Sequence, residues 1–174
     1  MVPDYDYTLL FPATARDDVI DQLWHLCDET SRDGLEAARG AECEVVLAIR
    51  SLPDMPAEVV REFPILPDGS HALGNVYLQV GPSGWSAFPD AVEFRLWPCT
   101  RRLQRACLGS MLLRDKLVRL LQWHGGHAGY VVNESCDPVE FWLESVGRTN
   151  DGHPAEYVVT AQAEPRADPD RGGS

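Results

Sequence analysis

Hydrophobic residues occupy every second position at the start of the chain, from Tyr5 to Phe11. This alternation, with aromatic side chains on one side, predicts a half-buried strand. From Thr14 the apolar spacing changes to three or four residues, which predicts a helix that ends near Asp28. Thr14 is the predicted N-cap, and Asp17 is the acidic half of a capping box.

The middle of the chain predicts strands separated by turns. Residues 30–41 are polar and include two glycines, which predicts a loop or a frayed turn. A short helix is predicted at 57–63, within a connection that contains several prolines. Runs rich in β-branched and apolar residues predict three strands, the first of them well buried, at 43–50, 75–80 and 91–97.

The pattern becomes helical again from Thr100, and after Gly109-Ser110 an apolar face continues to His124. Ser110 is the predicted cap of this second helix, and Gly125-Gly126 ends it with a left-handed residue. Three further strands are predicted beyond these glycines, at 128–134, 139–143 and 157–160.

The order of these elements predicts an α+β fold. Most successive strands are joined by connections too short for crossovers, so the expected architecture is a mainly antiparallel sheet with two main helices packed on one face. The chain has 174 residues, of which 44% are hydrophobic, and this is enough for one core. We expect a single domain over 1–163 and a disordered tail over 164–174.

The beginning of the chain has no basic leader, and no apolar run approaches the roughly 20 residues of a membrane span. These features predict a soluble protein of the cytoplasm that has no membrane partner. The five cysteines are odd in number and scattered, which predicts reduced thiols rather than a disulfide framework.

The formal net charge of −12 argues against a nucleic-acid partner, because phosphate backbones require a basic surface. An acidic protein instead attracts cationic proteins. Only one of the 15 basic residues is a lysine, a skew that is typical of GC-rich genomes and indicates a bacterial origin.

His124, His127 and Cys136 are the candidate ligands for a zinc ion. Two glycines end the helix between the histidines, so their side chains need not converge, and we predict neither a metal site nor a cofactor. The chain also lacks a nucleophile elbow and a phosphate-binding glycine loop, and we nominate no catalytic residue.

Positive charge gathers between Arg95 and Arg119, where seven basic residues stand against one acidic residue. The simpler explanation is the solvated face of an amphipathic helix. The functional alternative is a docking patch for an acidic segment or a phosphate, formed by Arg101, Arg102 and Arg105, because guanidinium groups bind such oxygens in pairs.

Trp85 and Phe88 lie in the connection between two predicted strands, next to glycine and proline residues. Exposed rings at such a place mark an interface, and Trp85 is therefore a candidate partner-binding residue. A loop that folds back onto the sheet would instead bury both rings, and the sequence leaves these alternatives open.

Five segments of the chain resemble the C-terminal half of small α+β proteins of GC-rich bacteria: 92–96, 113–121, 125–126, 130–134 and 139–143. These segments lie between residues 92 and 143, a span of about a third of the chain. This resemblance implies no particular activity. In size, acidity and α+β character the chain is also similar to immunity proteins that neutralise toxins.

These features favour a protein-interaction domain over an enzyme. Its most concrete form is an immunity-like inhibitor of a basic toxin, because an acidic protein associates quickly with a cationic one and can fill its cleft with carboxylates. The acids nominated for partner binding lie on the first predicted helix and at its end: Asp17, Asp18, Asp21, Asp28 and Glu29.

The alternative is a small-molecule enzyme or ligand-binding domain. Its pocket would lie between the sheet and the helix 110–124, with His124, His127 or Cys136 at the mouth. A third possibility is assembly through exposed strand edges and the Trp85 loop.

Overall fold

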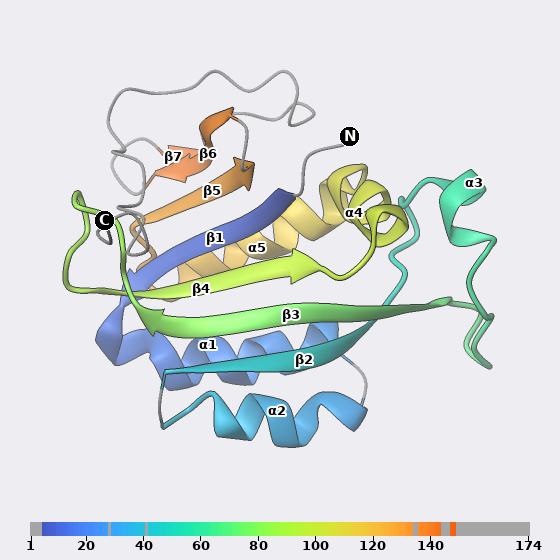
Figure 1. Ribbon diagram of the computed structural model, residues 1–174, viewed down its shortest axis with the longest axis horizontal. Coiled ribbons are helices and arrows are strands. Elements are labelled where there is room, and N and C mark those ends of the chain that lie inside the picture. The colour runs from blue at the N-terminus through green and yellow to red at the C-terminus, as the bar shows by residue number, and fades with distance from the viewer. Residues whose placement is uncertain (1–4, 28, 41, 134–135, 144–146, 149–174) are drawn as a thin grey trace, which may run out of the picture.

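The computed structural model consists of a seven-stranded antiparallel sheet and a layer of helices (Figure 1). It describes residues 5–27, 29–40, 42–133, 136–143 and 147–148. The strand order is β2-β3-β4-β1-β5-β6-β7, so the first strand of the chain lies in the middle of the sheet. This architecture confirms the predicted α+β fold.

The strands are β1 (Tyr5–Pro12), β2 (Cys43–Arg50), β3 (Ala72–Pro82), β4 (Ala91–Pro98), β5 (Ala128–Asn133), β6 (Cys136–Leu143) and β7 (Gly147–Arg148). The α-helices are α1 (Arg16–Leu23), α2 (Arg32–Ala37), α3 (Ala57–Val60), α4 (Arg101–Leu108) and α5 (Met111–Trp123). Short 3-10 helices flank α1 and precede α2: η1 (Ala13–Ala15), η2 (Trp24–Leu26) and η3 (Glu29–Ser31).

The main core lies between the sheet and the helices. The alternation predicted for β1 places Tyr7, Leu9 and Phe11 on the helix side, where all three are buried. They pack with apolar side chains of α1 and α5, among them Ile20 and Leu121. Each such burial stabilises the fold by roughly 1.5–3 kcal/mol, and these contacts fix the two helices against the sheet.

The opposite face of the sheet, which we call the outer face, carries a smaller apolar cluster. The connection between β3 and β4 folds back over this face, and Trp85 packs there against Leu10 and Tyr130. Only 2% of Trp85 is exposed. The ring therefore belongs to the packing of the fold, which favours the second of the two alternatives left open by the sequence.

The first helical region differs from its prediction in where it begins. The chain turns into η1 directly after β1, and the N-cap of α1 is Ala15, which makes no side-chain capping bond. The predicted cap at Thr14 is therefore wrong. The segment predicted as a loop or frayed turn instead contains the end of η3 and helix α2 as far as Ala37, and Leu35 of α2 is buried against the core.

Strand β2 is a half-exposed edge strand rather than the well-buried strand that its sequence predicts. Its free edge is covered by the chain itself. The hydroxyl of Ser31 accepts the N–H of Ala48 at 2.8 Å and donates to its carbonyl at 3.4 Å. An uncovered strand edge can pair with another chain, and these bonds occupy the edge of β2 at Ala48.

The boundaries of α4 and α5 follow the local sequence signals. Thr100 and Ser110 each accept a backbone N–H three residues ahead, as N-caps do. Gly125 has φ of 65°, the left-handed conformation expected at the end of α5. Gly126 is required for a different reason, since a Cβ there would lie 2.5 Å from Cδ2 of Leu121.

None of the helices within the described part of the chain could span a membrane, because none is both long and apolar enough. The predicted strand at 157–160 and the predicted tail at 164–174 lie outside the described residues.

Candidate functional site

A cavity of about 390 Å³, which we call the main cavity, lies between the sheet and the helices. Its sheet side is formed by residues of β1 to β4, among them Tyr7, Leu47 and Val76. Its helix side includes Leu23 of α1 and Leu117 of α5. All five side chains are buried, so the inner walls of the cavity are largely apolar.

One side of the main cavity lies beside the junction of α1 and η2. Leu52 and Met55, from the segment that follows β2, contribute further apolar wall. The N–H of Leu52 donates to the sulfur of Met55 at 3.4 Å, which holds this segment in a tight turn. The cavity is thus bounded by several elements that are far apart in the sequence.

The lining residues that are exposed to solvent are all ionisable, and we call them the polar rim: His25, Glu29, Arg50 and Lys116. Arg50 pairs with Asp68 at 3.0 Å. Lys116 has no carboxylate partner among the described residues. The rim therefore offers hydrogen-bonding groups of both charges at the solvent side of an apolar space.

Cys107 and Tyr7 meet in the wall of the main cavity. The hydroxyl of Tyr7 donates to the carbonyl of Cys107 at 3.3 Å. Burial raises the pKa of the Cys107 thiol to about 12. A thiol with that pKa is protonated at neutral pH, so Cys107 serves as an apolar wall group and not as a nucleophile.

The position of this cavity agrees with the predicted pocket between the sheet and the helix 110–124, but its lining differs. His25 and Cys27 line it, whereas His124 and His127 do not. His127 stacks on Phe88, with ring centroids 5.6 Å apart, at a shallow hollow formed with Pro12. The side chain of Cys136 lies outside the described residues.

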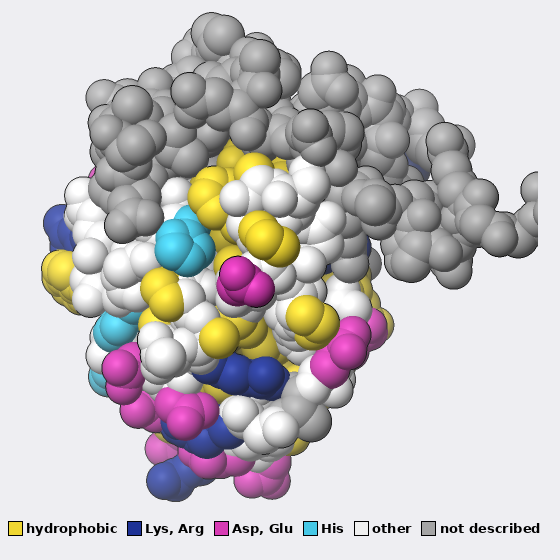
Figure 2. Space-filling model, turned by 90° about the vertical axis from the view of Figure 1, so that its left-hand side faces the viewer, with side chains coloured by type: hydrophobic (Ala, Val, Ile, Leu, Met, Phe, Trp, Pro, Cys, Tyr) yellow, Lys and Arg dark blue, Asp and Glu magenta, His cyan; other side chains and the backbone are white. Residues whose placement is uncertain are grey.

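Figure 2 views the end of the molecule from the left-hand side of Figure 1. Hydrophobic, histidine and acidic side chains are interspersed on this face, and the basic side chains in its lower part lie among acidic ones. This end of the molecule therefore presents no continuous field of one charge.

The acids nominated on the first helix lie in different surroundings. Asp17 and Asp18 are exposed on α1, and Glu29 belongs to the polar rim. Asp28 lies outside the described residues. Asp21 pairs with Arg39, so only part of the nominated group forms an open acidic surface.

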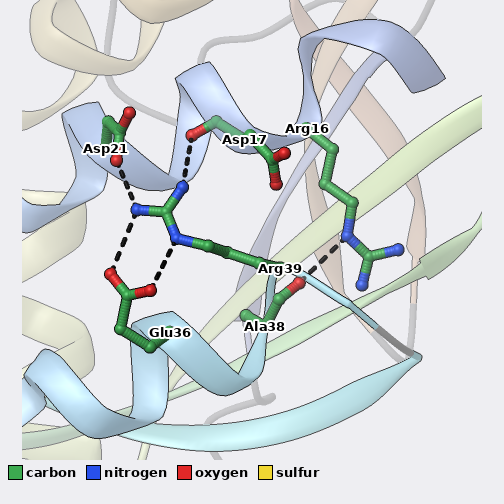
Figure 3. A network of polar contacts seen from close by, with 6 residues as sticks. All are labelled: Arg16, Asp17, Asp21, Glu36, Ala38 and Arg39. Carbon is green, nitrogen blue, oxygen red and sulfur yellow. Dashed lines mark hydrogen bonds and ion pairs between the residues drawn. The ribbon is translucent and has the colours of Figure 1, made fainter.

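Arg39 connects α1 with α2 (Figure 3). Its guanidinium donates to the carboxylates of Asp21 and Glu36 and, at 3.3 Å, to the backbone carbonyl of Asp17. Both carboxylates raise the pKa of the Arg39 guanidinium above its ordinary value, and the bond to Glu36 has a larger effect than the bond to Asp21. Arg16 adds a bond of 2.9 Å to the carbonyl of Ala38. Asp21 therefore helps to connect α1 with α2, in addition to adding negative charge to the surface.

The basic run between Arg95 and Arg119 does not form one surface. Arg114 is completely buried, and Arg95 pairs with the buried Asp6 on the outer face of the sheet. Arg102 pairs with Glu62.

Arg101 and Arg105 are exposed on α4. The predicted patch of three arginines is thus divided by the ion pair of Arg102.

Most residues of the polar rim, and Met55 in the wall of the main cavity, were not predicted from the sequence. The available signal was weak, because Leu52 and Met55 stand as isolated apolar residues in a proline-rich connection. This connection reaches the start of α5 through Asp54, which accepts from the hydroxyl of Ser110 and the N–H of Leu112, and such a contact between distant segments is not visible in local periodicity.

No protein-family model, no curated protein and no solved structure matches this chain. The resemblance of its C-terminal half to proteins of GC-rich bacteria therefore stays a prediction.

Proposed function

We propose that the chain is a ligand-binding domain that holds a small apolar molecule in the main cavity. The observation that supports this proposal is the combination of buried apolar walls with a rim of four ionisable side chains. Ligand sites in proteins are commonly apolar spaces with a few polar groups that orient the ligand.

The size of the main cavity supports the same proposal. Its volume of about 390 Å³ lies within the roughly 300–1,000 Å³ of small-molecule sites. A ligand that fills this space removes apolar surface from water on both sides, and each buried CH₂ group contributes about 0.8 kcal/mol. The polar rim would select ligands with one polar end.

The chemistry of the wall favours binding over catalysis by a thiol. The raised pKa of Cys107 keeps its sulfur protonated, as described above. The hydroxyl of Tyr7, the other polar group of that wall, is held by its bond to the Cys107 carbonyl. We therefore place this chain with binding proteins rather than with enzymes that act through these two side chains.

A neutral fluorescent probe, N-phenyl-1-naphthylamine, tests the proposal. Leu113 lines the main cavity, and Leu113→Trp should fill part of it and weaken probe binding at least about tenfold, or 1.4 kcal/mol. Leu112→Trp is the matched control, because Leu112 is 40% exposed on the same helix and does not line the cavity.

Equal binding of the probe by both tryptophan variants and the wild type would place it elsewhere and contradict the proposal. A probe that does not bind the wild type would do the same. Thermal unfolding provides a second measurement, since a ligand at 100 times its Kd stabilises the native state by about 2.7 kcal/mol.

A second candidate function is the binding of a cationic protein, in the immunity-like form suggested by the sequence. It is supported by the net charge of −12 and by Asp17 and Asp18, which are exposed and have no ion-pair partner among the described residues. Opposite charges accelerate association, and salt screens them.

Basic nuclease toxins are the probes for this second candidate. The double substitution Asp17→Asn with Asp18→Asn should weaken inhibition of the toxin, and added salt should weaken it further. Glu58→Gln with Asp90→Asn removes two exposed acids elsewhere and serves as the control. An equal loss in both double variants, or inhibition that does not respond to salt, would exclude the α1 acids as the contact.

A further inference from the structure

A second cavity, of about 610 Å³, lies where the outer face of the sheet meets the start of α4, and we call it the outer cavity. Pro98 is the one described residue that lines both cavities. Of the other residues in β4, Leu96 lines the main cavity and Trp97 lines the outer cavity. The wall of the outer cavity combines aromatic and cationic side chains with one acidic residue, Asp6, in contrast to the apolar wall of the main cavity.

The aromatic residues of the wall come from three adjacent strands, and besides Tyr5 of β1 they include a cross-strand pair. Tyr77 of β3 is the direct register partner of Trp97 of β4, and their ring centroids are 5.5 Å apart. Both rings are half-buried and line the outer cavity. Adjacent aromatic rings of this kind form a surface on which a planar ligand can stack, a contact worth about 1–3 kcal/mol for a nucleobase.

Two of the cationic groups nearby are already engaged. Arg95 donates to Asp6 at 2.6 Å, and its guanidinium lies over one face of the Trp97 ring, 5.2 Å from the centroid. Arg102, in the first turn of α4, pairs with Glu62. Both guanidinium groups therefore have partners within the fold.

Arg101 differs from them. It lines the outer cavity, it is exposed, and no carboxylate pairs with it among the described residues. It stands in the first turn of α4, which contains no acidic residue. A positive charge at this end of a helix is unfavourable, because the helix dipole is positive there. An anion beside Arg101 would offset that cost.

We propose that the outer cavity binds a small planar aromatic ligand that carries an anionic group, of the nucleoside monophosphate class. The ring stacks on Tyr77 and Trp97, and the anionic group lies at Arg101 and the first turn of α4. This site is independent of the main cavity, and it also differs from general nucleic-acid binding, which the net charge of −12 disfavours.

Titration calorimetry with adenosine 5′-monophosphate tests the site. Adenosine and inorganic phosphate represent the two halves of the ligand, and each should bind at least about tenfold more weakly than the complete nucleotide, because each makes only one of the two contacts. Equal affinity for adenosine would overturn the anionic half of the proposal, and equal affinity for phosphate would overturn the aromatic half.

Arg101→Gln should weaken nucleotide binding about tenfold, since a hydrogen bond to a charged group is lost. The matched control is Arg105→Gln, an exposed arginine of the same helix that does not line the cavity and should change the affinity less than about twofold. Removal of a positive charge from the first turn favours the helix, so weaker binding by the Arg101 variant would not reflect unfolding. Equal effects of both substitutions would contradict the site.

The cysteines provide a second measurement that separates the two cavities. Cys99 is exposed and lines the outer cavity, whereas Cys27 lines the main cavity. Bound nucleotide should slow the reaction of Cys99 with N-ethylmaleimide and leave that of Cys27 unchanged, as read by mass spectrometry. Protection of Cys27 instead of Cys99, or no binding of the nucleotide at millimolar concentration, would refute the proposal.

Discussion

Trp85 lies flat on Tyr130, with ring centroids 4.3 Å apart and an angle of 9° between the ring planes. The stack joins the connection between β3 and β4 to strand β5 across the outer face of the sheet. Without it, this connection would have no large apolar contact with the sheet beyond that of Phe88. Trp85 therefore holds its own loop in place.

Trp85→Ala should lower the free energy of unfolding by about 3–5 kcal/mol, because a fully buried ring is replaced by a cavity. Trp123→Ala is the control, since Trp123 is 68% exposed and its loss should change stability by less than about 0.5 kcal/mol. Urea unfolding followed by circular dichroism measures both values. A stability near that of the wild type for the Trp85 variant would restore this ring as a candidate partner contact.

The bond between Ser31 and Ala48 makes a second prediction. Ser31→Ala leaves the N–H and carbonyl of Ala48 without their partner, at a cost of about 1–3 kcal/mol. It also uncovers the edge of β2, so the variant should associate as its concentration rises. Light scattering across a dilution series measures this association, and a strictly monomeric variant of unchanged stability would show that the edge is closed by other contacts.

The sequence predicts caps at both Thr14 and Ser110, and in the structure only Ser110 of these two makes a capping bond. Ser110 accepts the N–H of Leu113 at 3.0 Å and donates to Asp54 at 2.7 Å, and Ser110→Ala should cost about 1–2 kcal/mol. Thr14→Ala should cost less than about 0.5 kcal/mol, because Thr14 caps no helix. Chemical denaturation measures both values, and a cost of about 1–2 kcal/mol for Thr14→Ala as well would mean that Thr14 is a cap after all.

Asp6 predicts a pH dependence of stability. Burial raises the pKa of its carboxyl above the ordinary 3.8 and outweighs the lowering effect of Arg95 and Thr8, and the negative charge of Glu93 raises it further. Because the folded pKa is the higher one, the stability from this group is present below the unfolded pKa and is lost as pH rises through the folded pKa.

The free energy of unfolding of the wild type, minus that of Asp6→Asn, should therefore fall as pH rises from below 3.8 to neutral. Urea titrations at a series of pH values measure this difference. A difference that is constant with pH, or that grows, would mean that Arg95 and Thr8 dominate over burial.

Much of the fold follows from local patterns. The alternation of β1 and the cap at Ser110 depend on a few neighbouring residues, and the structure confirms them. Helix α2 was missed because its sequence is polar and contains Gly34, both of which favour loops. It forms because Leu35 gains burial in the core, a contact between distant segments that local propensity does not include.

The candidate site was predictable in its position but not in its lining. The apolar face of α5 had to pack against the sheet, so the predicted pocket lay between this helix and the sheet. His25 and Glu29 come to its rim because the chain bends through η2 and η3 on its way to β2. That path is decided by the strand order, which hydrophobic periodicity does not encode.

The two ends of α5 also bear on how distant relatives of this chain can be recognised. Ser110 is fixed by its capping bond, Gly125 by its positive φ, and Gly126 by its close approach to Leu121. These three requirements are independent, and no other residue meets the last two without strain. The spacing Ser-x14-Gly-Gly, with apolar residues at helical intervals between, should therefore outlast most other positions as such sequences diverge, and a pattern search built on it could detect homologues that overall similarity no longer reveals.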